Sequence, residues 1–124
     1  MNEKINSSLK RINSINIDPY YLFQVTEAYV FGEYLEFGTD NIRFIDVLVQ
    51  LTPKEKNAKK HEKLKLEKIE AAHKRFSNHL ELLLYPEQEV KDAIKKNVHN
   101  LRIHSFRDRN EWKMVEKELV FKED

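Results

Sequence analysis

The 124 residues include no cysteine, two glycines and three prolines, and these low counts exclude several kinds of site. Without cysteine the chain forms no disulfide and no thiolate metal site or nucleophile, which fits a reducing compartment. Two glycines are too few for a glycine-rich phosphate loop. No stretch approaches the roughly 20 apolar residues of a membrane span, and residues 1–18 lack the apolar segment of a signal peptide. We therefore expect a cytoplasmic protein with no membrane contact.

Charge of one sign is also missing, because 22 basic residues face 21 acidic ones and the formal net charge is +1. Such a balance gives no general affinity for nucleic acid. With 40% hydrophobic residues, the chain has the composition and size of one ordinary domain with its own core. No internal repeat or linker divides it, so we expect residues 1–124 to form a single domain.

Hydrophobic periodicity predicts alternating helices and strands. β-branched and aromatic residues indicate strands, whereas apolar residues three and four apart indicate helices. A stripe of Leu66, Ile69, Ala72 or His73, and Phe76 favours one long helix, and Trp112, Val115 and Leu119 favour a last one. We expect helices at about residues 2–14, 54–77, from Pro86 to about 98, and from Asp108 through 119, and strands at about 21–31, 42–51, 79–85 and 101–104. This pattern predicts an α/β fold, a small mixed sheet with helices packed against it.

One carboxylate, Asp46, lies inside the apolar run of residues 42–51, just downstream of both glycines. A charge inside a buried strand is costly unless something pairs with it, and such positions are often functional. Two interpretations remain open for Asp46. It can be structural, paired with Arg43 or a lysine or reaching solvent at the end of the sheet, or it can hold a metal ion.

The segment YVFGEYLEFGTDNIRFIDVLV, residues 29–49, resembles the signature of the minimal nucleotidyltransferases, relatives of the kanamycin nucleotidyltransferase in the DNA polymerase β-like superfamily. In that family a strand ends in Phe-Gly-Ser, and a later strand carries Asp-x-Asp-Leu-hydrophobic-Val. Here Phe31-Gly32 matches the first motif and Asp46-Val47-Leu48-Val49 the second. The resemblance implies a nucleotidyltransferase-like sheet in which Gly32 and Glu33 take the nucleotide-binding positions. It also implies metal at Asp46 with Glu81, from the strand at 79–85, and with Asp40.

The departures from the family pattern fall on the chemistry. Glu33 replaces the serine that would approach the triphosphate, and Phe44 replaces the first of the paired aspartates. A glutamate there repels phosphate, and a phenylalanine cannot ligate Mg²⁺, which prefers oxygen. The resemblance therefore implies a degraded active site with no cofactor, or Mg²⁺ at Asp46 and Glu81 if activity survives.

Other charged residues give weaker indications. Residues 54–75 hold nine Lys or Arg against four Glu, which suits either a solvated helix face with internal ion pairs or contact with nucleic acid, and we favour the solvated face. Arg102, His104, Arg107 and Arg109 could meet an acidic or phosphate partner. The five histidines lack zinc-site spacing.

Two functions of different class follow. The first is a nucleotidyltransferase-like binding or regulatory module without catalysis. Its partner would be a protein, either a helical toxin-like protein of the kind that family members accompany, as in toxin–antitoxin pairs, or a second copy of the chain. The second is an active metal-dependent enzyme that transfers a nucleoside monophosphate to a hydroxyl of a protein, RNA or small molecule. Glu33 and Phe44 favour the first function.

Overall fold

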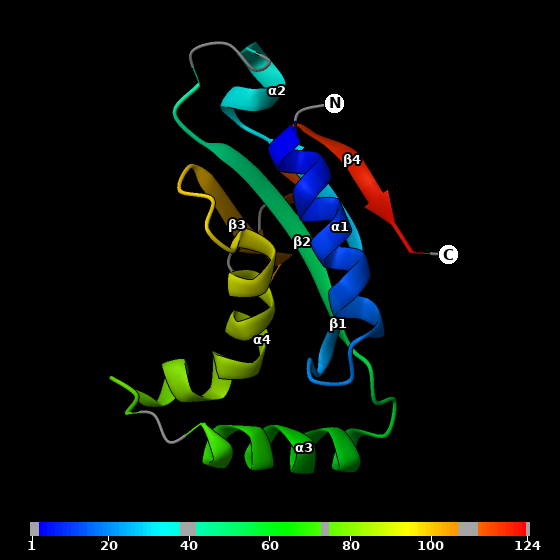
Figure 1. The fold of residues 1–124 in the computed structure, drawn as a ribbon, viewed down its shortest axis with the longest axis vertical. Helices are drawn as coiled ribbons and strands as arrows, with labels where there is room; N and C mark the ends of the chain where they lie inside the picture. Colours follow the sequence, from blue (N-terminus) through cyan, green and yellow to red (C-terminus); the bar gives the residue numbers. More distant parts are fainter. Residues whose placement is uncertain (1–2, 38–41, 73–74, 107–111, 124) are drawn as a thin grey trace.

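The structure, a computed structural model, describes residues 3–37, 42–72, 75–106 and 112–123. Figure 1 shows one sheet with helices α1 and α4 on one of its faces and helix α3 across one end. The elements in chain order are α1 (Glu3–Ile17), β1 (Phe23–Phe31), α2 (Glu33–Phe37), β2 (Ile45–Pro53), α3 (Ala58–Ala71), α4 (His79–Lys95), β3 (Leu101–Ser105), the 3-10 turn η2 (Trp112–Met114) and β4 (Lys117–Lys122).

The sheet has four strands in the order β3-β2-β1-β4. β1 lies antiparallel to both β2 and β4, whereas β2 and β3 run parallel. A parallel pair needs a long crossover, and the chain from β2 to β3 supplies α3 and α4 for it. The described residues therefore form an α/β fold, a mixed sheet with helices packed against it, as the sequence predicts.

The main core lies between the sheet and the two helices α1 and α4. Each helix turns one apolar stripe toward the strands, and alternate residues of each strand meet it. The buried residues of this core are Ile5, Ile12 and Ile15 from α1, Val90 and Ile94 from α4, and Val25, Val30, Ile45, Val47, Val49 and Leu101 from the strands. The helix predicted at residues 2–14 and the strands predicted at 21–31, 42–51 and 101–104 are confirmed within a few residues.

The predicted strand at residues 79–85 is wrong, because these residues form the first turns of α4. Asn78 caps the helix by accepting a hydrogen bond from the backbone N–H of Glu81 at 2.8 Å. Leucine favours helix, and a short apolar run does not distinguish helix from strand by pattern alone. Pro86, predicted in a first turn, lies instead inside α4. Figure 1 shows α4 changing direction along its length, and a proline in a helix interior is a usual cause of such a bend.

Two further predictions are corrected. The predicted last helix is instead η2 followed by strand β4 at the edge of the sheet. Trp112 is buried as expected, but Leu119 is exposed on β4. The valine and phenylalanine of KELVFK suit a strand. The hydrogen bonding of this segment to β1 makes it a strand and not a helix. Asp108 and Glu111, the predicted helix start, lie outside the described residues.

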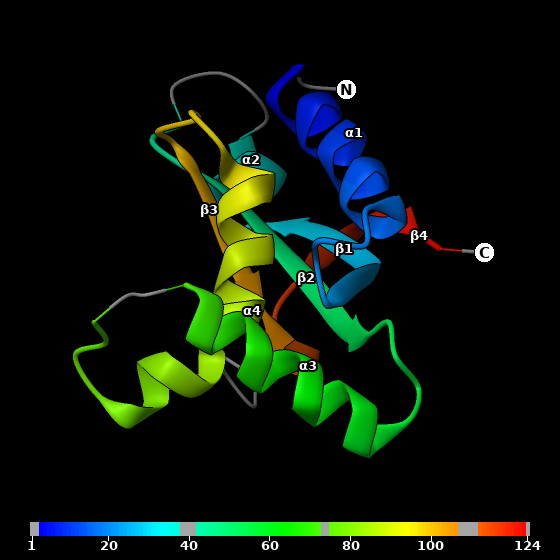
Figure 2. The same cartoon turned by 60° about the horizontal axis from the view of Figure 1, so that its bottom comes forward.

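The helix predicted at residues 54–77 is shorter, 58–71, and faces differently. Its buried residue is His61, whereas Leu66 of the predicted apolar stripe is 60% exposed. α3 sits beyond one end of the sheet, the end that comes forward in the second view (Figure 2). Lys68 holds it there, because its ammonium pairs with Glu89 of α4 at 2.9 Å and lies 3.6 Å from the centre of the Tyr20 ring. None of the helices in the described ranges has the length and apolar character needed to cross a membrane.

Candidate functional site

The candidate site lies on the face of the sheet turned away from α1 and α4. Ile45, Val47 and Val49 of β2 face these helices, so the residues between them, including Asp46, point to the other face. The strand register places Phe31 of β1 and Arg102 of β3 on either side of Asp46. The topology therefore collects one side chain from each of three neighbouring strands around this carboxylate.

Asp46 is 4% exposed and both of its oxygens are occupied. Oδ1 accepts a hydrogen bond from Nε of Arg102 at 2.7 Å and lies 2.9 Å from Nε2 of His104. Oδ2 accepts from Nη2 of Arg102 at 3.0 Å. The guanidinium thus binds the carboxylate through two parallel hydrogen bonds, the strongest geometry for such a pair.

These contacts set the ionisation of the pair. Burial alone raises the pKa of Asp46, but the hydrogen bonds from Arg102 and His104 outweigh it and hold the pKa below its ordinary value. The same hydrogen bond to Asp46 raises the pKa of Arg102. Asp46 is therefore a carboxylate at neutral pH, neutralised by a permanent cation of the same chain.

Gly32 fits closely against Asp46 at the end of β1. Its φ is 75°, a backbone conformation that glycine adopts without strain. A Cβ at this position would lie 2.9 Å from Oδ2 of Asp46, too close for an ordinary contact. The glycine and the aspartate that carry the family resemblance are therefore neighbours in space, and the small residue makes room for the carboxylate.

The residues that depart from the family pattern also take part in contacts around Asp46. Phe44 lies under Arg102, whose guanidinium carbon is 4.1 Å from the centre of the ring. Glu33 accepts hydrogen bonds from the backbone N–H of Arg43 at 2.8 Å and from its guanidinium at 2.9 Å. The backbone contact and then the guanidinium lower the pKa of Glu33. The structural interpretation of Asp46 named Arg43 as its partner, but Arg43 pairs with Glu33 instead.

Aromatic rings cover the inner side of this cluster. The rings of Phe31 and His104 have centres 5.2 Å apart, and Trp112 stands 5.3 Å from Phe31 and 6.0 Å from His104. Trp112 is 3% exposed, and its indole N–H donates to the backbone carbonyl of Ser105 at 3.2 Å. The turn η2 therefore fixes Trp112 against Phe31 and His104, the histidine that contacts Asp46.

A hollow of about 380 Å³ opens beside Gly32. Its described lining residues are Gly32, Leu35, Glu36 and Glu116, so among the residues that the structure describes two carboxylates and no basic side chain border it. A polyphosphate entering this hollow would meet like charge. The hollow is thus better suited to a cationic or neutral group than to a nucleotide triphosphate.

The structure separates the residues proposed as metal ligands. Glu81 is exposed in the first turn of α4, and α4 covers the opposite face of the sheet from Asp46. The strand next to β2 is β3, which contributes Arg102 and His104 in place of a carboxylate. Asp40 lies outside the described residues. Among the described residues no group of three or more His, Cys, Asp or Glu side chains is placed to hold a metal ion.

The sequence indicates Arg102 and His104 as part of a basic cluster but does not join them to Asp46. The acidic or phosphate partner suggested for that cluster stays a prediction, but within the chain Arg102 and His104 already contact Asp46. Arg107 and Arg109 lie outside the described residues. Alternation in Leu101-Arg102-Ile103-His104 places two basic side chains on one face of β3, and Asp46 is the buried carboxylate next to them. The missing information was that β2 and β3 are adjacent and parallel.

Comparison with protein-family models, with curated proteins and with solved structures found no match for this chain. Its function is therefore inferred from the site itself.

Proposed function

We propose that this chain is a nucleotidyltransferase-like domain that has lost catalysis and acts as a binding or regulatory module for a protein partner. The observation that carries the proposal is the closed pair of Asp46 and Arg102. A divalent cation needs several oxygen ligands, with carboxylates to balance its charge. Here the one buried aspartate of β2 is already balanced by a guanidinium, which never deprotonates in proteins.

Two neighbouring features support the same conclusion. Phe44 takes the position of the first metal-binding aspartate of the family, and its ring stacks against the guanidinium of Arg102. The hollow beside Gly32 is lined by Glu36 and Glu116, which oppose the binding of phosphate. Nucleotidyl transfer of this family's kind needs metal ligands, a phosphate site and a small residue after the glycine. In this chain Phe44, the pair Glu36 and Glu116, and Glu33 stand at these three places, and none of them has suitable chemistry.

Calorimetric titration tests the loss of catalysis. ATP with Mg²⁺ or Mn²⁺ should give no saturable heat with the 124-residue protein, and an assay for nucleotide transfer to protein or RNA should give no product. Saturable, metal-dependent nucleotide binding that disappears in Asp46→Ala would contradict the proposal and favour the active enzyme. Thermal unfolding with Mg²⁺ provides a second readout, because a ligand at 100 times its Kd adds about 2.7 kcal/mol to the free energy of unfolding.

A restoration experiment tests the nucleotidyltransferase-like character separately. The triple variant Glu33→Ser, Phe44→Asp, Arg102→Asp would place two new carboxylates near Asp46 and a serine after Gly32. Repulsion among the carboxylates should make this variant less stable than the parent without metal. Mg²⁺ or Mn²⁺ should recover part of that loss by neutralising them.

The matched control keeps Phe44 and changes only Glu33→Ser and Arg102→Asp, which leaves one carboxylate fewer. Its stability should respond less to metal than that of the triple variant. A folded triple variant whose stability is independent of divalent cations would show that residues 44, 46 and 102 do not outline a former metal site. The nucleotidyltransferase-like part of the proposal would then be abandoned, whereas the absence of catalysis would still be judged by the titration.

A further inference from the structure

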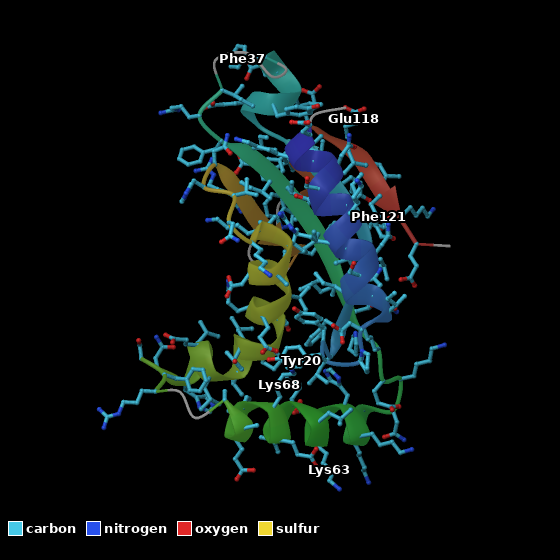
Figure 3. All side chains as sticks on the ribbon, viewed as in Figure 1. Tyr20, Phe37, Lys63, Lys68, Glu118 and Phe121 are labelled. Carbon is cyan, nitrogen blue, oxygen red and sulfur yellow. The ribbon has the colours of Figure 1, made fainter. Side chains whose placement is uncertain are left out.

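A second surface, far from Asp46, is the outward face of α3. Figure 3 shows Lys68 on the side of this helix that faces Tyr20 and Lys63 on the side that points away from the rest of the molecule. Residues three, four and seven positions from Lys63 share its side of the helix. The outward face, as we define it, consists of Lys59, Lys63, Leu66, Glu67 and Glu70, all of them exposed. Lys60, three positions before Lys63, is also exposed and lies at the border of this face.

The charges of the outward face are sorted along the helix. Lys59 and Lys63 occupy its first half and Glu67 and Glu70 its second half. This order opposes the helix macrodipole, which favours acidic residues at the N-terminus and basic residues at the C-terminus. The first turn of α3 holds no acidic residue. The arrangement therefore costs the isolated helix some stability, which an oppositely ordered row of charges beside it would offset.

The same order is complementary to itself. Two copies of α3 in antiparallel orientation, related by a two-fold axis near residue 65, would place Lys59 opposite Glu70 and Lys63 opposite Glu67 of the second copy. The symmetry repeats both pairs, giving four ion pairs around a centre where the two Leu66 side chains approach each other. Such a contact, in which the same patch serves both subunits, is the commonest way in which soluble proteins dimerise.

Nothing in the described part of the fold obstructs this approach. α3 lies across one end of the molecule, and the sheet, α1 and α4 all lie on its other side (Figures 1 and 2). Leu66 is 60% exposed, a large apolar side chain at the middle of the charged face. Within the described residues the only ion pair inside α3 joins Lys65 to Glu62, at 3.7 Å, so the four charged residues of the outward face have no ion-pair partner on their own helix.

We propose that the outward face of α3 is a self-association surface, on which two copies of this chain pair antiparallel through Lys59, Lys63, Glu67 and Glu70. A single helix pair gives a small interface, so the dimer is weak and depends on concentration. This face is separate from the Asp46 site, and its role does not rest on the function proposed there.

Sedimentation equilibrium of the 124-residue protein over a range of concentrations tests the proposal. We expect a reversible monomer–dimer equilibrium at about 0.1 M salt that weakens at about 1 M salt, where charges are screened over a few ångströms. Two charge-reversal variants should each weaken dimerisation by about tenfold or more, since four attractive pairs become repulsive. These variants are Lys59→Glu with Lys63→Glu, and Glu67→Lys with Glu70→Lys.

Combining the two sets of reversed charges distinguishes a loss of ion pairs between subunits from damage to the fold. An equimolar mixture of the two reversed variants should form a heterodimer, because every opposing pair is then of opposite charge. The quadruple variant, which carries all four reversals, should dimerise by itself again. The circular dichroism spectrum and thermal midpoint of each reversed variant show whether α3 and the rest of the fold are intact. Loss of dimer in a variant that remains folded, together with its recovery in the mixture and in the quadruple variant, cannot come from unfolding.

The control variant Lys10→Glu with Lys95→Glu changes the net charge equally but lies on α1 and α4, and it should leave dimerisation unchanged. A wild-type protein that stays monomeric at all concentrations would overturn the proposal. So would failure of both the mixture and the quadruple variant to associate. A salt-sensitive complex with mixed-sequence RNA or duplex DNA in place of a dimer, lost with Lys59→Glu and Lys63→Glu, would assign the basic half of α3 to nucleic acid and also overturn it.

Discussion

The two faces of the sheet are built on different physical principles. The face toward α1 and α4 is apolar, and residues such as Ile12, Val25 and Ile94 are fully buried there. The other face carries a buried carboxylate, Asp46, with Arg102 and His104 bound to it. The first face is held by the removal of apolar surface from water, whereas the second combines charge-assisted hydrogen bonds with the packing of aromatic rings such as Trp112.

Within one sheet, the face toward α1 and α4 supplies much of the stability, and the Asp46 face carries the charged side chains. The apolar face is closely packed, whereas the buried charge on the other face depends on each of its partners. A side chain on the Asp46 face can therefore change its chemistry while α1 and α4 keep the fold. The loss of metal ligands proposed for this site is compatible with that separation.

The largest effect is expected on the helix-covered face. Ile12→Ala removes a side chain with no exposure and leaves a cavity, so the free energy of unfolding should fall by about 2–5 kcal/mol. Urea unfolding followed by circular dichroism measures the change. Ile17→Ala on the same helix is the matched control, because Ile17 is 85% exposed and should cost about 0.5 kcal/mol or less. Equal costs at the two positions would contradict the placement of α1.

On the Asp46 face, Arg102→Ala should cost about 1–3 kcal/mol of unfolding free energy, because it leaves a buried carboxylate without two of its hydrogen bonds. Arg102→Ala in an Asp46→Ala background should cost much less, and the difference in a double-mutant cycle measures the coupling. Additive effects of the two substitutions would show that the pair does not stabilise the sheet.

Acid should weaken the Asp46 face in a defined range of pH. The folded pKa of Asp46 lies below its ordinary value of 3.8, so the pair contributes stability above pH 3.8 that is lost as the pH falls through the folded pKa. In Arg102→Ala the hydrogen bonds and charge that lower this pKa most are removed, so the pKa of Asp46 moves upward and its contribution to the acid-dependent loss of stability shrinks. Urea midpoints measured down to about pH 3 should therefore fall less steeply with acid in Arg102→Ala than in the parent, and an equally steep fall in the two proteins would refute this.

The helix-covered side should respond to milder acid, through His61. This histidine is buried against the ring of Phe23, and burial lowers its pKa from 6.5. The folded state therefore resists its protonation, and stability should fall as the pH drops below 6.5 toward the folded pKa. His61→Leu should flatten the stability profile between about pH 7 and pH 5. A slope that persists in this variant would assign the effect to another group.

Much of the sheet could be predicted from the sequence because its strands have strong local signals. The run at residues 45–49 is apolar throughout except for Asp46, and the run at 23–31 is rich in aromatic and β-branched residues. Residues 79–85 are different, since the short apolar run HLELLLY does not distinguish helix from strand by its pattern. Asn78 followed by Glu81 is a helix-start signal that the sequence does contain, and in the structure Asn78 caps α4. The pairing of β1 with β4 is a fact of the folded chain, and it decided the other element predicted wrongly.

The site was predictable only in part, because the contacts between strands are not visible in the sequence. Asp46 and Gly32 could be identified from residues 29–49, and the structure places them in contact. Glu81 was predicted as a metal ligand because residues 79–85 were predicted as a strand beside Asp46, and these residues form a helix instead. Arg102 is separated from Asp46 by 56 positions in the chain, and only the parallel alignment of β2 with β3 reveals that they are paired.

The strand order has a consequence for the newly made chain as it leaves the ribosome. β1 is synthesised early and pairs with β2 soon afterwards, but its second edge waits for β4, the last strand of the sheet to be made. Until β4 arrives, β1 presents unpaired N–H and C=O groups along one side, a template for pairing with other chains. Nascent chains that stall before residue 117 should therefore be the species most prone to aggregation and most dependent on chaperones.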